Sequence, residues 1–205
     1  MPSSAPSFPP FTPYVQHNRT PLPPRSNSRP LPASVSRILP FLFLGPVSAT
    51  SNGPFLTSAH VTHILSIGKS PAPNPTAAAI TYHRLGLLDK ASADMAAVVA
   101  QSVAIIDAVE RDGGVVLVHC SAAISRSLAV VAAYLMLRRG KTLRAALEEL
   151  TRGGAVVAPN AGFLRQLGAM EESGVGGKAT VEVGEGELEG TRRVGDVLGK
   201  AGVDE

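Results

Sequence analysis

One nine-residue segment, His119 to Ser127, holds the residue types that could do covalent chemistry on an anion. Within it, Cys120 and Arg126 are separated by five residues. A loop of that length can turn its backbone N–H groups towards one centre, and the start of a following helix adds positive potential there. Such a site favours a tetrahedral dianion and an ionised thiol. The planar fork of Arg126 can hold two oxygens of that dianion, which a lysine cannot do.

Each of these two residues also has an ordinary structural explanation. A lone cysteine at the end of an apolar strand is usually an inert core residue, and an arginine at a helix start can simply be solvated. The combination of strand, loop and helix favours chemistry instead. Because the chain has one cysteine, a disulfide and a cysteine-based zinc site within the chain are both excluded.

The elements around this segment must hold the cysteine at a strand end and the arginine at a helix start. The apolar run VVLVH (115–119) predicts a strand buried on both faces. The other predicted strands are 38–45, 61–68 and 80–87, and the predicted helices are a short one within 48–59 and longer ones over 94–112, 126–139, 142–152 and 160–171. This alternation favours an α/β fold, a mainly parallel sheet of about four to five strands flanked by helices. Ligands bind at the carboxyl ends of strands in such sheets.

The two ends of the chain differ in composition from the middle. Residues 1–34 contain ten of the seventeen prolines, three arginines and no acidic residue, and residues 171–205 contain nine acidic residues, four basic residues and nine glycines. Segments with so little apolar material cannot offset the entropy of folding. We therefore predict a disordered Pro-rich arm over 1–34, a folded domain over 35–170 and a disordered Gly-rich acidic tail over 171–205. The arm's prolines could present a polyproline ligand to a binding partner.

Charge and hydropathy narrow the classes of partner. The arm is +3, the tail −5 and the whole chain +3, which leaves +5 for the middle. That charge suits an anionic substrate but is weaker than the basic stripes of nucleic-acid-binding proteins, so no nucleic acid is expected.

No apolar run reaches the roughly 18–20 residues that span a bilayer, so no membrane is expected either. The arm lacks the apolar core of a secretory signal, and its prolines oppose the helix of a transit peptide. We expect a protein of the cytoplasm or nucleus.

The segment from His119 to Ser127 resembles the active-site loop of cysteine-dependent protein phosphatases, specifically the dual-specificity group. In that group His-Cys is followed by five residues, an arginine, and then serine or threonine. Two flanking stretches are also similar: ILPFLFLG followed by THILSIG resembles the opening of these domains, and the PN-x-GF-x-x-QL pattern from Pro159 to Leu167 resembles their closing segment. The resemblance covers about residues 35–170, and the loop is its most specific part.

The resemblance implies hydrolysis of phosphotyrosine and of phosphoserine or phosphothreonine in proteins, with no metal or other cofactor. Cys120 would be the nucleophile that forms a thiophosphate, Arg126 the phosphate clamp, and Asp89, 31 residues upstream of the cysteine, the proton donor. Ser127 would stabilise the leaving thiolate, and His119 would support the loop and the low thiol pKa. The phosphate-binding residues would be Ser121, Ala122, Ala123, Ile124, Ser125 and Arg126.

Two residues leave alternatives. Asp94 is a second candidate for the proton donor, although its place before an apolar helix favours a role as N-cap. Ala123 stands where the family loops usually have glycine. If the loop needs a left-handed conformation there, alanine resists it by about 1–2 kcal/mol. This departure supports an alternative function, a pseudophosphatase that binds phosphorylated partners without turnover. The loop also lacks the basic residues that lipid phosphatases of the superfamily typically carry, which disfavours a lipid substrate.

Overall fold

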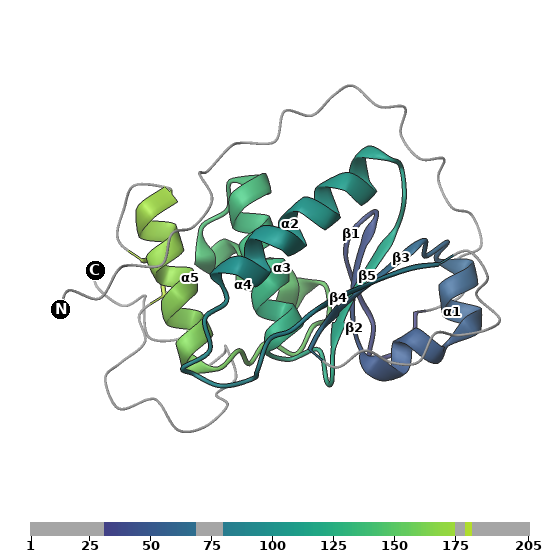
Figure 1. Ribbon diagram of the computed structural model, residues 1–205, viewed down its shortest axis with the longest axis horizontal. Helices are drawn as coiled ribbons and strands as arrows, with labels where there is room; N and C mark the ends of the chain where they lie inside the picture. Colours follow the sequence, from purple (N-terminus) through teal and green to yellow (C-terminus); the bar gives the residue numbers. More distant parts are fainter. Residues whose placement is uncertain (1–30, 69–79, 175–178, 182–205) are drawn as a thin grey trace.

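A five-stranded sheet forms the centre of the computed structural model, which describes residues 31–68, 80–174 and 179–181 (Figure 1). The spatial order is β1-β2-β5-β3-β4, and every neighbouring pair is parallel except β1 with β2. The strands are β1 (Ser36–Leu39), β2 (Leu42–Pro46), β3 (His63–Ile67), β4 (Thr81–Leu85) and β5 (Val116–Cys120). The predicted fold class, a mainly parallel α/β sheet, is confirmed.

β5 is the middle strand of the sheet, and all of its residues are buried. It pairs with β2 as far as Pro46 opposite Cys120, and with β3 as far as Ser66 opposite His119. The carboxyl ends of these parallel strands therefore meet at one edge of the sheet. Cys120 lies at that edge, which is where ligands bind in sheets of this kind.

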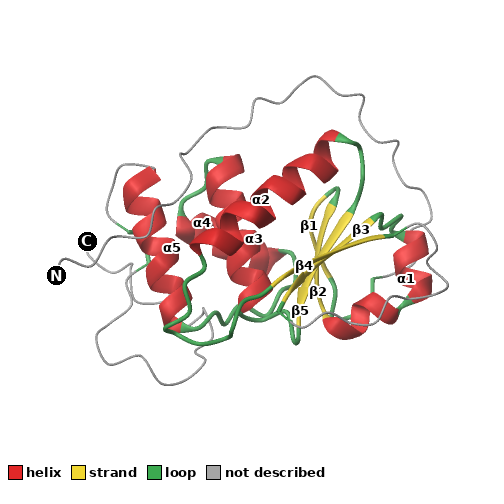
Figure 2. Ribbon diagram, viewed as in Figure 1, coloured by secondary structure: helices red, strands yellow, loops and turns green. Residues whose placement is uncertain are grey.

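Helices cover both faces of the sheet (Figure 2). A short 3₁₀ helix and α1 lie on one face, and α2 to α5 lie on the other (Figure 1). Their bounds are Val47–Ser51 for the 3₁₀ helix, Gly53–Ser58 for α1, Ala96–Arg111 for α2, Arg126–Arg139 for α3, Leu143–Arg152 for α4 and Ala161–Gly174 for α5. Every residue from Ser127 to Leu137 is buried, because α3 packs against the sheet and against α2, α4 and α5. In the part of the chain that the structure describes, no helix has both the length and the apolar character to cross a bilayer.

The apolar run 38–45 is a hairpin rather than the single strand predicted for it. β1 and β2 are antiparallel, and Leu39 lies opposite Leu42, so the chain reverses at Pro40 and Phe41. Proline has a fixed φ and no N–H to give to a strand ladder, which suits it to a turn. The prediction of one strand is wrong because both arms of the hairpin are apolar and no polar residue marks the turn between them.

The folded part of the chain extends past residue 170, where the acidic tail was predicted to begin. α5 continues beyond this point, and the buried carboxylate of Glu171 accepts hydrogen bonds from the backbone N–H groups of Leu143 (2.9 Å) and Thr180 (2.7 Å). A carboxylate at that place caps the first turn of α4, which composition alone could not show. The rest of the predicted tail, and residues 1–30 of the predicted arm, lie outside the described residues.

Candidate active site

The connection from β5 to α3 places the predicted chemical groups at one point. Cys120 is the last residue of β5, and Arg126 is the first residue of α3. The loop between them therefore runs from the end of the central strand to the start of a buried helix. Because both of these elements are packed on all sides, the two ends of the loop are fixed relative to each other. The strand, loop and helix predicted from the sequence are all present.

Cys120 is buried, with 4% of its surface exposed. Burial by itself raises the pKa of a thiol, but hydrogen bonds to the sulfur outweigh it here and the pKa of Cys120 is lowered. The donors are the hydroxyl of Ser127, at 3.2 Å from Sγ, and the backbone N–H groups of Ser127, Ala123 and Ala122. The loop thus favours a thiolate at the strand end.

Arg126 turns its guanidinium back over the loop. Its Nη2 donates a hydrogen bond to Oγ of Ser121 at 2.8 Å, and its Nε lies 3.6 Å from Oδ2 of Asp89. At that distance the two form an ion pair but no hydrogen bond. Nε is buried and has no hydrogen-bond partner among the described residues. An oxygen of a bound oxyanion would satisfy this donor.

Asp89 reaches the same loop from the segment that follows β4. Its Oδ1 accepts hydrogen bonds from the hydroxyl of Ser125 at 2.6 Å and from Nδ2 of Asn160 at 2.9 Å. The side chain is thereby tied to the loop and to the start of α5. Asp94, the rival candidate, accepts a hydrogen bond from the backbone N–H of Ala96 at 2.9 Å, at the start of α2. The geometry gives Asp94 a capping contact and places Asp89 at the loop.

His119 is fully buried and faces away from the thiol. Its Nδ1 lies 3.2 Å from the carbonyl oxygen of Cys120, and its Nε2 lies 2.5 Å from Oγ of Ser66 on β3. A carbonyl can only accept, so Nδ1 carries the hydrogen and Nε2 accepts from the Ser66 hydroxyl. Burial lowers the pKa of His119, which favours this neutral form, although the bond to the Cys120 carbonyl opposes the shift. These two contacts join His119 to β3 and to the carbonyl at the end of β5.

Ala123 has a left-handed backbone conformation, with φ at 62°. This is the conformation in which a loop glycine would be free of strain and an alanine is not. Ala123 is also buried and packs in the main core cluster. The carbonyl of the next residue, Ile124, accepts a hydrogen bond from the N–H of Ala158 at 3.1 Å. Burial and this hydrogen bond hold the strained residue in place.

Three functional contacts of the site were not foreseen. Asn160 caps the start of α5, where its Oδ1 accepts a 3.0 Å hydrogen bond from the N–H of Phe163, and its Nδ2 also donates a hydrogen bond to Asp89. The partnership of Ser66 with His119 had no local signal. Gly68 lies so close to Arg126 that a Cβ there would collide with Nη1 of the guanidinium.

No group of three or more metal-ligating side chains occurs among the described residues.

Comparisons with known proteins agree on one family. Residues 42–173 match the family model described as dual specificity phosphatase, catalytic domain. The chain is 41% identical over 133 residues to dual specificity protein phosphatase 1 of Arabidopsis thaliana, a match that covers 64% of this chain and 66% of that protein. It is 36% identical over 130 residues to dual specificity protein phosphatase 5 of Rattus norvegicus, of which the match spans only 34%.

Solved structures give the same result. Human DUSP28 aligns with a TM-score of 0.63 and 33% identity, over 71% of this chain and 98% of that one. The human tyrosine phosphatase-like serine/threonine/tyrosine-interacting protein also aligns with a TM-score of 0.63, at 34% identity, over 68% of this chain and 96% of that one.

Proposed function

The chain belongs to the dual specificity phosphatase family, and from this premise we propose that it removes phosphate from phosphorylated protein side chains through a thiophosphate on Cys120. One observation carries the proposal: the thiol with the lowered pKa and the guanidinium of Arg126 lie at opposite ends of one loop whose N–H groups converge on the sulfur. This arrangement supports both the binding of a dianion and nucleophilic attack on it.

In the first step the Cys120 thiolate attacks phosphorus, and the bond from phosphorus to the side-chain oxygen breaks. Backbone N–H groups of the loop and the guanidinium of Arg126 stabilise the charge on the three equatorial oxygens. Asp89 in its acid form gives a proton to the departing tyrosyl, seryl or threonyl oxygen. The dephosphorylated protein then leaves, and phosphate stays on the sulfur.

In the second step water attacks the thiophosphate, and the bond from sulfur to phosphorus breaks. Asp89, now a carboxylate, takes a proton from the water, and inorganic phosphate is released. The hydroxyl of Ser127, 3.2 Å from the sulfur, stabilises the thiolate that departs. The ties from Ser125 and Asn160 hold Asp89 near both reactions.

The test uses the wild-type protein and a Cys120→Ser variant. With p-nitrophenyl phosphate and with phosphotyrosyl, phosphoseryl and phosphothreonyl peptides, we expect turnover by the wild type and none by the variant. Rapid acid quenching should also trap phosphate on Cys120 of the wild type, which mass spectrometry can locate. Equal turnover by the two proteins would refute the assignment of the nucleophile.

The alternative, binding of phosphorylated partners without turnover, has one specific observation in its favour, the left-handed alanine at position 123. The retention of thiol, guanidinium and Asp89 in one site argues for the enzyme. An inert wild type that still binds phosphopeptides, with affinity lost in Arg126→Ala, would establish the binding protein instead.

A further inference from the structure

A second arginine, Arg84, lines the same cleft as Arg126. A cleft of about 400 Å³ is lined by residues that follow β3, by the end of β4 and the residues after it, and by the start of α3. These residues are Gly68, Arg84, Gly86, Leu87, Leu88 and Arg126. Two of them are cationic and none is acidic. A cleft lined by one sign of charge attracts groups of the opposite sign.

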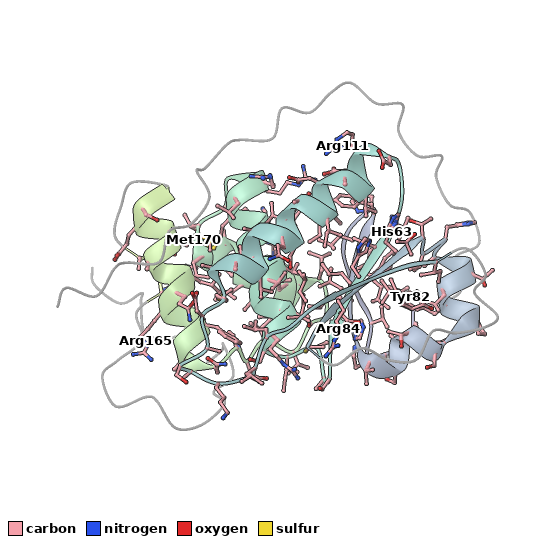
Figure 3. The ribbon with its side chains drawn as sticks, viewed as in Figure 1. His63, Tyr82, Arg84, Arg111, Arg165 and Met170 are labelled. Atoms are coloured by element: carbon pink, nitrogen blue, oxygen red, sulfur yellow. The ribbon has the colours of Figure 1, made fainter. Side chains whose placement is uncertain are left out.

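The strand register fixes the face of the sheet on which Arg84 lies. Arg84 pairs with Ser66 across β3 and β4, and Ser66 pairs with His119 across β3 and β5. Paired residues of parallel strands direct their side chains to the same face. The three side chains therefore form a row on one face of the sheet, and Cys120, the residue after His119 on β5, points to the opposite face. Arg84 thus reaches the cleft around the carboxyl edge of the sheet, from the face opposite the thiol. Figure 3 shows Arg84 at the end of the sheet where the loop lies.

A single glycine separates the two arginines. Nε of Arg84 donates a hydrogen bond to the carbonyl oxygen of Gly68 at 3.1 Å, and a Cβ on Gly68 would collide with Nη1 of Arg126. The φ of Gly68 is +115°, which residues with a side chain rarely adopt. Arg84 is thus fixed through Nε, and among the described residues its two terminal amino groups have no hydrogen-bond partner, so they can bind a further acceptor.

The two arginines differ in whether a carboxylate balances their positive charge. Arg126 forms an ion pair with Asp89 at 3.6 Å, whereas no carboxylate of the described residues pairs with Arg84. In the proposed reaction Arg126 holds the phosphate that is removed, so Arg84 faces a different group. Leu88, with 67% of its surface exposed, offers an apolar contact at the rim of the same cleft.

We propose that Arg84 binds a second acidic group of the substrate, a carboxylate or phosphate on a side chain within two residues of the phosphorylated one. This inference rests on the proposed function and names a specificity-determining residue for it. An extended peptide advances about 3.3 Å per residue. When the phosphorylated side chain is bound at Arg126, the side chains one or two residues away therefore come within reach of Arg84, on the other side of Gly68. The guanidinium fork suits both carboxylate and phosphate.

The experiment measures how strongly the full chain prefers peptides with an acidic residue near the phosphotyrosine over peptides with a neutral one. Peptides with one phosphotyrosine carry glutamate, phosphoserine or glutamine at each of positions −2, −1, +1 and +2. We expect the wild type to prefer the acidic peptide at one or more of these positions, by about 5-fold in kcat/KM for glutamate and by roughly 10-fold or more for phosphoserine. In Arg84→Gln both ratios should fall to about 1, and Arg84→Lys should keep only part of the phosphoserine ratio.

The ratio of acidic to neutral peptide is the readout, because it cancels any effect of Arg84 on Arg126 through Gly68. Arg165→Gln is the matched control: it removes the same charge from an exposed site on α5, away from Arg84 in Figure 3, and should leave the ratios unchanged. The inference is overturned if Arg84→Gln keeps the wild-type ratios, or if no position shows a preference. It is also overturned if Arg84→Gln lowers kcat/KM for a bisphosphorylated inositol lipid but for none of the peptides.

The same peptides separate this inference from the proposed function. Binding to the Cys120→Ser protein, followed by fluorescence anisotropy, needs no turnover. A wild type without activity would refute the enzyme, whereas an Arg84-dependent ratio of dissociation constants in the Cys120→Ser protein would still support the second site. An active wild type with equal dissociation constants for acidic and neutral peptides, and equal kcat/KM, would support the enzyme and refute the second site.

Discussion

The two ends of α3 are built differently. At its carboxyl end, Arg138 pairs with Asp107 of α2 and Arg139 pairs with Glu110, each at 2.7 Å. Glu110 also accepts a hydrogen bond from the hydroxyl of Tyr134 at 2.9 Å, and burial raises the pKa of this tyrosine, which keeps it protonated. These contacts join α3 to α2. The carboxyl end is organised for stability.

At the amino end of α3, charges and donors are only partly matched. The ion pair of Arg126 with Asp89 is longer, at 3.6 Å, and Nε of Arg126 is a buried donor without an acceptor among the described residues. Buried polar groups without partners are rare in proteins and usually have an explanation. Oδ1 of Asp107, at the carboxyl end, is likewise buried without a partner among the described residues, so an unpartnered atom alone does not distinguish the two ends. The amino end differs in its longer ion pair and in the N–H groups that converge on Cys120, the arrangement that is proposed to hold a phosphate.

The same backbone angle appears at both ends with different residues. Gly140, which ends α3, and Ala123, in the loop before it, both have φ at 62°. Glycine adopts this conformation without strain, whereas alanine resists it by about 1–2 kcal/mol. Along α3 the chain therefore has glycine at the end without proposed chemistry and a strained alanine beside the proposed reacting groups. Strain is not confined to the loop, because His60, after α1, also has a positive φ of 53°.

The largest effect should come from replacing the arginine at each end in turn. Arg126→Lys keeps the charge but loses the planar fork, so we expect kcat/KM with a phosphotyrosyl peptide to fall by about 10²–10³-fold with little change in Tm. Arg139→Lys should instead lower Tm and leave kcat/KM within about 2-fold. A similar fall in kcat/KM for both variants would remove the contrast between the two ends.

Asp89→Asn should give the next largest effect. The amide cannot donate a proton to a poor leaving group, so kcat with a phosphotyrosyl peptide should fall by about 10²-fold. The fall should be much smaller with p-nitrophenyl phosphate, whose leaving group needs less protonation. Asp94→Asn is the control, and it should affect stability only, since Asp94 contacts the first turn of α2. A larger loss of kcat in Asp94→Asn would reverse the assignment of the acid.

Tyr134→Phe tests the carboxyl end alone. The change removes the hydroxyl that donates to Glu110, and we expect the free energy of unfolding to fall by about 1.5 kcal/mol. Urea denaturation measures this change, and kcat/KM should stay at the wild-type value. A change in kcat/KM without a change in stability would show that the two ends of α3 are coupled.

The smallest effect should come from Ala123→Gly, and Gly140→Ala is its counterpart at the other residue with φ at 62°. Ala123→Gly relieves the strain, but it also loses a buried methyl group, a loss of about 0.8 kcal/mol, so the net gain in stability should be below about 1 kcal/mol. We expect kcat/KM to rise, because the cradle gains room. Gly140→Ala should destabilise the fold by about 1–2 kcal/mol with no effect on kcat/KM. Unchanged kcat/KM in Ala123→Gly would mean that the alanine is already accommodated.

The sequence predicted local elements better than the contacts between them. The strand that ends at Cys120 and the helix that begins at Arg126 follow from β-branched and helical patterns in neighbouring residues. The hairpin at Pro40 was missed because its two arms are equally apolar. The bonds from Ser66 to His119 and from Asn160 to Asp89 join residues 53 and 71 positions apart. No local pattern encodes such pairs, because they arise only when the sheet and α5 are assembled.

The pKa of Cys120 is the most direct measure of whether the loop is organised for chemistry. Because the chain has one cysteine, the rate of alkylation by iodoacetamide can be followed against pH without interference from a second thiol. We predict half-maximal reactivity well below the value of about 8.5 for a free thiol, and a rise in that midpoint in Ser127→Ala. A midpoint at or above 8.5, or one that Ser127→Ala leaves in place, would contradict the lowered pKa on which the proposed hydrolysis depends.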